Sequence, residues 1–219
     1  SRLGGNVIPG AVPEFKAVDL RLINYYRKQM EVLEIDVRMN TRVTSEMLKK
    51  EKADVFIIAV GATTKKLNVP GADSDKCTDA VNVLLGEKKA GQNVVMVGGG
   101  LVGCETALWL AQQGRNVTVL EALPDILSSG KPVPHMNRIM LIDLMAQAGV
   151  KVITSSSLLE INKEGAVIID SRFRKQTVKA DTVVMAIGFN ANNQLFRELY
   201  GEVGNVYNVG DSEAASNIM

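Results

Sequence analysis

Three glycines, Gly98, Gly100 and Gly103, stand where an apolar run gives way to a helix-like pattern in "VVMVGGGLVGCE" (residues 94–105). A glycine has no Cβ, so the backbone there can turn tightly and a diphosphate can approach it closely. The first amides of a helix also attract anions, because they lack carbonyl partners and carry about +0.5 of dipole charge. The spacing therefore predicts a diphosphate-binding turn, although a glycine-rich turn without a ligand is the competing interpretation. The residues of this predicted turn are Gly98, Gly99, Gly100, Leu101, Val102 and Gly103.

An acidic residue follows the turn at about the distance that dinucleotide-binding motifs require. The strand-like run "NVTVLEA" ends in Glu121 and Ala122. A carboxylate at this place accepts hydrogen bonds from ribose hydroxyls and repels a 2′-phosphate. Two unit charges about 4 Å apart interact by about 4 kcal/mol at an effective dielectric of about 20. The sequence therefore predicts NAD(H) rather than NADP(H).

Few other residues have the type and spacing of catalytic groups. His135 is the single histidine and stands at a predicted helix start, where capping or surface placement is the simpler interpretation. Cys77 and Cys104 lack the spacing of a redox dithiol, and two cysteines do not make a disulfide framework. Trp109 is interpreted as a core residue. We therefore expect no catalytic residue and no metal site.

These residues must be positioned by strands that alternate with helices, which predicts an α/β fold with an open, mostly parallel sheet. Apolar periodicity and turn residues delimit the elements. Helices are expected at 15–33, 44–53, 101–113, 135–149 and 192–201. Strands are expected at 35–43, 54–62, 93–97, 116–122, 150–154, 157–162, 166–170, 177–180, 181–188 and 206–211, with a hairpin turn at 163–165. The looser stretch 64–92 is expected to be a linker, and 123–134 a loop.

Composition excludes several classes of protein. The chain has 219 residues, with 25 basic and 24 acidic side chains and a net charge of +1. This balance gives no electrostatic reason to expect nucleic acid or an anionic membrane as a partner. The apolar runs are far shorter than the about 18 residues that a membrane span needs, and no signal peptide is visible. A cytoplasmic location is expected.

Three further pieces carry a resemblance to known proteins. "AVGA" (59–62) and "AIGF" (186–189) each end a buried run in a glycine turn, and "VYNVGD" (206–211) closes in Gly-Asp. This ordered set resembles the two-dinucleotide flavoproteins, in which an NAD(P) domain is inserted into an FAD domain. The resemblance implies cofactor contacts by Gly61, Ala186, Ile187 and Gly188, and flavin contacts by Gly210 and Asp211.

The whole chain is similar to the C-terminal half of Old Yellow Enzyme-like NADH:flavin oxidoreductases, the relatives of 2,4-dienoyl-CoA reductase, enoate reductase and trimethylamine dehydrogenase. "RLGGNVIPGAVPEFK" (2–16) resembles the segment after the second FAD strand of these proteins, which implies FAD contacts by Gly4 and Gly5. "GDSEAASNIM" (210–219) resembles the start of their last FAD helix. By the same resemblance, Glu105 is expected near the nicotinamide, with stabilisation of the helix start as the alternative.

The resemblance implies a Rossmann-like NAD(H)-binding domain at 89–190, inserted in a partial, truncated FAD-binding domain at 1–88 and 191–219. The same resemblance implies that this sequence lacks the first FAD loop of the family and the barrel that carries FMN and a 4Fe-4S cluster. We expect NADH to be positioned for hydride transfer to FAD and on to that barrel, which is the expected partner together with a small-molecule substrate. The chain alone is expected to bind NAD(H), to hold no FAD and to be inactive. The alternatives are a ferredoxin or disulfide reductase-like flavoprotein and a non-catalytic NAD(H) sensor.

Overall fold

The computed structural model describes residues 2–216, and these divide into two compact units. Unit 1 comprises residues 2–8, 18–63 and 189–216, and unit 2 comprises residues 9–17 and 64–188. The chain therefore passes between the units four times. Unit 2 takes in 9–17 and 64–88, which the sequence analysis placed in the first FAD segment. The assignment of a cofactor to each unit stays a prediction.

Unit 2 is built on a five-stranded parallel sheet, as the alternation of strands and helices predicted. Apolar β-branched residues fill its central strands, which are buried on both faces as parallel strands usually are. The strand order is β3 (Cys77–Asp79), β10 (Thr182–Met185), β4 (Asn93–Val97), β5 (Asn116–Leu120), β6 (Lys151–Ile153).

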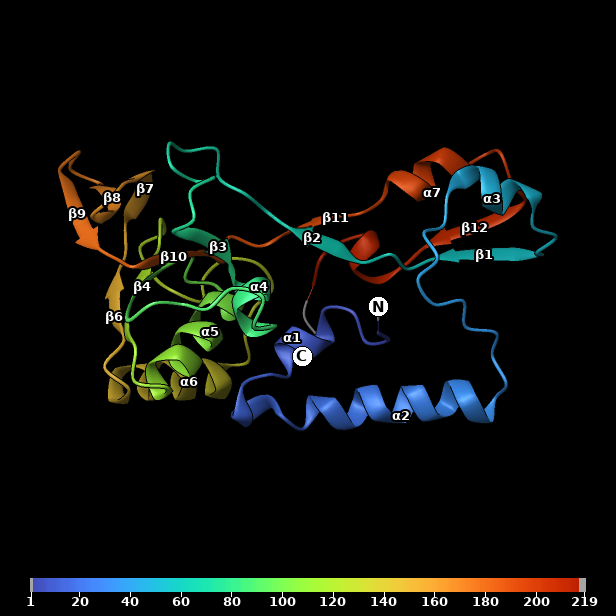
Figure 1. Ribbon diagram of the computed structural model, residues 1–219, viewed down its shortest axis with the longest axis horizontal. Helices are drawn as coiled ribbons and strands as arrows, with labels where there is room; N and C mark the ends of the chain where they lie inside the picture. Colours follow the sequence, from blue (N-terminus) through green and yellow to red (C-terminus); the bar gives the residue numbers. More distant parts are fainter. Residues whose placement is uncertain (1, 217–219) are drawn as a thin grey trace. The chain divides into compact units, whose positions relative to one another are not determined.

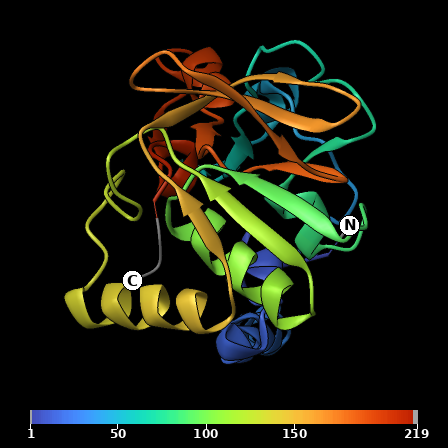
Figure 2. The same ribbon diagram turned by 90° about the vertical axis from the view of Figure 1, so that its left-hand side faces the viewer.

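Different layers cover the two faces of this sheet (Figures 1 and 2). One face packs against helices, and the other packs against a three-stranded antiparallel sheet. The helices are α4 (Ala80–Leu84), α5 (Leu101–Gln112) and α6 (His135–Gln147), and the antiparallel strands are β7 (Ser156–Ile161), β8 (Gly165–Asp170) and β9 (Lys175–Lys179).

Alternation along β4 divides the core of unit 2 between these layers. Val94 and Met96 pack with Cys104 and Leu108 of α5. Val95 and Val97 instead pack with residues of β7 and β8. Successive side chains of a strand point to opposite faces, so this one strand contributes to both apolar clusters. Trp109 packs against the helical cluster, as expected for a core residue.

Unit 1 contains less regular structure. Its strands form two small sheets: β1 (Val55–Ile58) pairs with β12 (Asn205–Asn208) in parallel, and β2 (Ala62–Thr64) pairs with β11 (Phe189–Ala191). Thr44 caps α3 (Ser45–Lys50), since its hydroxyl accepts the amide of Met47 at 3.4 Å. The remaining elements are α1 (Val7–Gly10), α2 (Asp19–Val32) and α7 (Gln194–Leu199), with single 3₁₀ turns η1 (Glu14–Lys16, in unit 2) and η2 (Gly210–Ser212).

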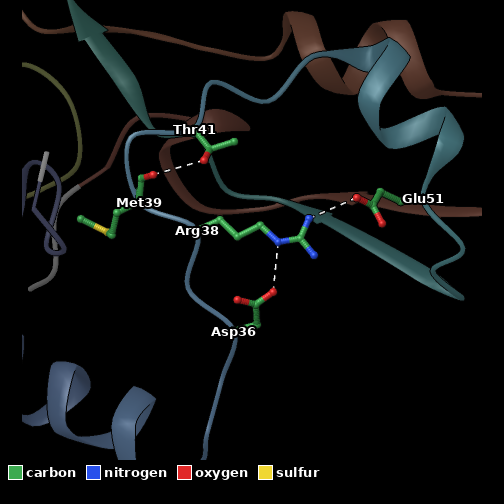
Figure 3. Close-up of polar contacts among 5 residues, drawn as sticks. All are labelled: Asp36, Arg38, Met39, Thr41 and Glu51. Atoms are coloured by element: carbon green, nitrogen blue, oxygen red, sulfur yellow. Dashed lines mark hydrogen bonds and ion pairs between the residues drawn. The ribbon is translucent and has the colours of Figure 1, made fainter.

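The predicted strand at 35–43 is wrong. This segment is irregular, with Asn40 at positive φ, as is Glu34 immediately before it. Arg38 donates to Asp36 and Glu51, and the hydroxyl of Thr41 donates to the backbone oxygen of Met39 (Figure 3). A strand requires a hydrogen-bonded neighbour, and none of the strands that the structure describes pairs with this segment. The alternating pattern alone is therefore not enough to form a strand here.

Two further expectations need correction. The run 64–92 is more than a linker, because it contains β3, which pairs with β10, and α4. The strand expected at 54–62 forms as β1, but Val55 is 47% exposed and Ile57 is 66% exposed. Only one strand, β12, pairs with β1 in the part of the chain that the structure describes. A two-stranded parallel pair cannot bury both of its faces, so the expected burial is absent.

Candidate dinucleotide site

The glycine turn joins β4 to α5 at the carboxyl edge of the parallel sheet, where open α/β sheets bind their ligands. Gly98 has a φ of +107°, and a Cβ on it would lie 2.5 Å from the backbone oxygen of Ala186. A Cβ on Gly103 would lie 2.0 Å from the oxygen of Gly98. Both glycines are therefore required by the packing of α5 and β10 around the turn.

Gly100 differs from the other two glycines. A Cβ on it would meet nothing closer than the hydroxyl of Ser129, at 3.6 Å. Its φ of −73° is accessible to any residue, so neither the fold nor the turn requires a glycine. The space beside Gly100 is thus the one place in the turn where the missing side chain leaves room for a ligand.

The first turn of α5 faces this space. Gly100 is the N-cap, and its oxygen accepts the amide of Cys104 at 2.9 Å. The amides of Leu101, Val102 and Gly103 have no hydrogen-bond acceptor within the helix, because they belong to its first turn. Three amides and the positive end of the helix dipole fit a diphosphate at this position.

Glu121 follows β5 and is buried, with 8% of its surface exposed. One carboxylate oxygen accepts the amide of Gly99 at 2.6 Å, and the other accepts the amide of Leu123 at 2.8 Å. The carboxylate thereby ties the glycine turn to the end of β5. Each carboxylate oxygen has a second lone pair, so this role and the predicted contact with a ribose are compatible. Ala122 is exposed beside it.

Glu105 lies one turn into α5 and pairs with a residue that the sequence analysis missed. The ammonium of Lys16 lies 3.2 Å from both carboxylate oxygens, and both side chains are about one-fifth exposed (21% and 19%). Lys16 ends η1, far from Glu105 in the sequence, and no local pattern indicates the contact. The pair brings the segment 9–17 to the start of α5 within unit 2.

The predicted residues after β10 lie at the same edge of the sheet. The amide of Ala186 donates to the oxygen of Val97 at 2.7 Å, and Ile187 follows it. Gly188 has a φ of +96°, and its oxygen accepts the amide of Lys65. Unit 2 therefore brings together the glycine turn, Glu121 and Ala186.

The remaining residues that are predicted to contact a cofactor lie in unit 1. Gly5, Gly61 and Gly210 all have positive φ, and a Cβ on any of them would meet nothing within 4 Å. Gly4 is packed differently, since its Cβ would lie 2.8 Å from Ile8. Asp211 accepts the amide of Ser216 at 3.0 Å. Open backbone at three turns fits the approach of a cofactor.

Metal binding, thiol reactivity and a membrane span were also considered for residues 2–216. No group of three or more His, Cys, Asp and Glu side chains is arranged to hold a metal ion there. Cys104 is buried and its Sγ lies 3.3 Å from the oxygen of Gly99. Burial, followed by the charges of Glu121 and Glu105, raises the pKa of this thiol to about 12. None of the helices described is long and apolar enough to cross a membrane.

Comparisons with known proteins identify the family to which the chain is related. The profile of the family described as "Pyridine nucleotide-disulphide oxidoreductase" matches residues 22–215. A cinnamate reductase of Clostridium sporogenes is 38% identical over 217 residues, which are 99% of this chain and 32% of that protein. An NADH oxidase of Thermoanaerobacter brockii is 27% identical over 95% of this chain and 33% of that protein.

A solved structure extends the agreement to the fold. The complex of a 2-naphthoyl-CoA reductase with 2-naphthoyl-CoA matches with a TM-score of 0.90 and 31% identity, over 99% of this chain and 33% of that one. The chain thus spans about a third of the length of the relatives it matches.

Proposed function

Because the chain belongs to the pyridine nucleotide-disulphide oxidoreductase family, we propose that it is the nucleotide-binding portion of an NADH-dependent flavin oxidoreductase. The family and the relatives named as reductases or as an NADH oxidase support redox chemistry with NAD(P) and FAD. The observation that carries the proposal is the contrast among the three glycines. Gly98 and Gly103 are closed by backbone atoms, whereas Gly100 is open.

In this proposal, the chain's own residues bind and orient the nucleotide. The amides at the start of α5 hold the diphosphate, and Glu121 accepts hydrogen bonds from the adenosine ribose. Glu105, held in place by Lys16, orients the nicotinamide. The bound flavin would supply the acceptor for the hydride, and open backbone at Gly5, Gly61 and Gly210 would allow the flavin cofactor to approach.

The partner in this proposal is the rest of a longer protein. The chain covers 32% of the cinnamate reductase and 33% of the 2-naphthoyl-CoA reductase. We propose that the remaining part holds the first FAD loop and a barrel with FMN and a 4Fe-4S cluster, which passes electrons to a small-molecule substrate. The exposed face of β1, which carries Val55 and Ile57, is consistent with further covering structure.

The test is to titrate the purified chain with NADH and with NADPH while recording the flavin absorbance. We expect NADH to bind at least about tenfold more tightly, because a ribose 2′-phosphate would meet the Glu121 carboxylate. Tighter binding of NADPH would contradict the assignment of Glu121. Stoichiometric FAD in the purified chain would contradict the proposed dependence on a missing loop.

A second measurement addresses catalysis by the longer protein. We expect the full-length product to oxidise NADH with an artificial dye as acceptor, and the chain alone to show no turnover. Binding of NADH without oxidation by the full-length product would instead support a sensing role. Substitution of Glu105 by Gln should slow hydride transfer in the full-length product and leave the affinity for ADP unchanged, since ADP lacks the nicotinamide.

A further inference from the structure

The loop between β5 and α6 is held firmly against the glycine turn. The amide of Leu127 donates to the oxygen of Gly99 at 2.7 Å, and the side chain of Leu127 is buried despite a φ of +55°. Ile126 is also buried, and its Cγ2 lies 2.7 Å from the position that a Cβ on Gly99 would occupy. Residues 126 and 127 therefore pack directly against the glycine turn at Gly99.

The polar side chains at both ends of this loop fix its path. Arg138 of α6 forms an ion pair with Asp125, and it donates to the oxygen of Ile126 at 3.3 Å. The hydroxyl of Ser128 turns back to the oxygen of Asp125 at 2.6 Å. The loop is thus closed on itself up to Ser128, and Ser129 is the next residue.

Ser129 has a different environment from its neighbour Ser128. Among the described residues, leaving aside Gly100 and its two chain neighbours, only this hydroxyl lies within 4 Å of the position that a Cβ on Gly100 would occupy. A diphosphate that uses the space beside Gly100 would therefore place an oxygen within hydrogen-bonding reach of this hydroxyl. A hydrogen bond from a hydroxyl to a charged oxygen is short and about twice as strong as one between neutral groups.

We propose that Ser129 is a diphosphate-binding residue, whose hydroxyl donates to the nucleotide in the space beside Gly100. The inference rests on the proposed function, because it assumes that the dinucleotide uses the glycine turn. It assigns a binding role to the loop 125–129, which carries no sequence motif. The bound diphosphate then lies between two elements, the first turn of α5 and this loop.

The test uses the whole chain with three single substitutions, Ser129→Ala, Ser129→Thr and Ser128→Ala. Affinities for NADH and for ADP are measured by calorimetry, and thermal unfolding verifies that each variant is folded. We expect Ser129→Ala to weaken both ligands by about tenfold, because one hydrogen bond to a charged group is lost. Ser129→Thr, which keeps a hydroxyl, should retain most of the affinity.

Ser128→Ala is the matched control, since the hydroxyl of Ser128 is engaged with its own loop. We expect this variant to bind NADH within about twofold of the unsubstituted chain. Equal affinities for the Ser129→Ala variant and the unsubstituted chain would overturn the role of Ser129. Equal losses in Ser128→Ala and Ser129→Ala would also overturn it, by showing an effect of loop order alone. Failure of the unsubstituted chain to bind NADH would instead contradict the proposed function.

Discussion

At the scale of single residues, the three glycines of one motif have different physical roles. Gly98 and Gly103 are enclosed by backbone atoms, so a side chain there would collide with the fold. A Cβ on Gly100 would come no closer than 3.6 Å to the hydroxyl of Ser129, an ordinary contact distance, so a side chain there would collide only with a ligand. The motif therefore contains both a folding requirement and a binding requirement, and substitutions can separate them.

We predict that Gly103→Ala lowers the free energy of unfolding by about 3 kcal/mol or more, because its Cβ would overlap the oxygen of Gly98. Gly100→Ala should change stability by less than about 1 kcal/mol and weaken NADH by about tenfold or more. Denaturant unfolding and calorimetric titration measure the two quantities. The prediction fails if Gly100→Ala binds NADH normally, or if Gly103→Ala is as stable as the unsubstituted chain.

Cys104 gives a prediction about pH. Burial raises the pKa of its thiol to about 12, above the value of about 8.5 for an unfolded chain. The folded state therefore keeps the proton more tightly than the unfolded state. Its contribution to stability is fully present below about pH 8.5 and is lost as the pH rises towards 12.

The free energy of unfolding should fall above about pH 9, with a contribution from Cys104 that approaches about 1.4 kcal/mol per pH unit. Urea titrations between pH 8 and pH 10.5 measure this slope. Cys104→Ala is the control and should remove that part of the slope. An identical slope in both proteins would show that Cys104 does not carry the effect.

At the scale of elements, the sequence analysis correctly predicted the helices, strands and turns whose formation depends mainly on their own residues. The strand at 93–97, the helix at 101–113 and the hairpin turn at 163–165 agree with the structure to within a residue or two, because periodicity and turn residues act locally. Two failures share one cause. The segment 35–43 alternates like a strand, and β1 is as apolar as a buried strand, but pairing depends on residues distant in sequence.

The candidate site divides in the same way. Its glycines and Glu121 follow a spacing that can be read along the chain. Lys16 reaches the site through its ion pair with Glu105, and Ser129 lies beside Gly100. The stretch 2–16 that carries the resemblance contains Lys16 but does not indicate this ion pair, and Ser129 belongs to no motif. The prediction of a linker at 64–92 was incomplete, because a strand of only three residues, β3, forms there by pairing with β10. Such a short strand has no periodicity of its own.

α4 gives a prediction at this scale, because it is short and depends on its cap. Asp79 accepts the amide of Asn82 at 2.9 Å and also the side-chain amide of Asn82 at 2.9 Å. We expect Asp79→Ala to lower the free energy of unfolding by about 1–2 kcal/mol, and Asp79→Asn to retain most of the stability. Urea unfolding of both variants measures this difference, and equal losses would contradict a capping role.

At the scale of the whole molecule, the two units differ in how well they are buried. The two apolar clusters of the core both lie in unit 2. Unit 1 exposes large apolar side chains on α2, β1 and β12, among them Tyr26, Ile57 and Tyr207. Apolar burial is the main favourable term in folding, so unit 2 should be the more stable unit.

We predict two unfolding transitions, with unit 1 unfolding first. The single tryptophan, Trp109, lies in unit 2, and all four tyrosines (Tyr25, Tyr26, Tyr200 and Tyr207) lie in unit 1, so each unit has its own spectroscopic probe. NADH at about 100 times its Kd should stabilise the tryptophan transition by about 2.7 kcal/mol and leave the tyrosine transition in place. Coincident transitions, or a shift of the tyrosine signal alone, would contradict the division.

The pairing of β1 with β12 joins Val55 to Asn205, and nearly all residues of unit 2 lie between these two strands in the sequence. During synthesis at about 5–20 residues per second, β1 leaves the ribosome many seconds before its partner exists. The last residues of unit 2 are synthesised in this interval, during which the apolar residues of β1 have no strand to pair with. Translation speed and chaperone access over residues 64–204 should therefore influence the yield of folded protein more than the same factors do elsewhere in the chain.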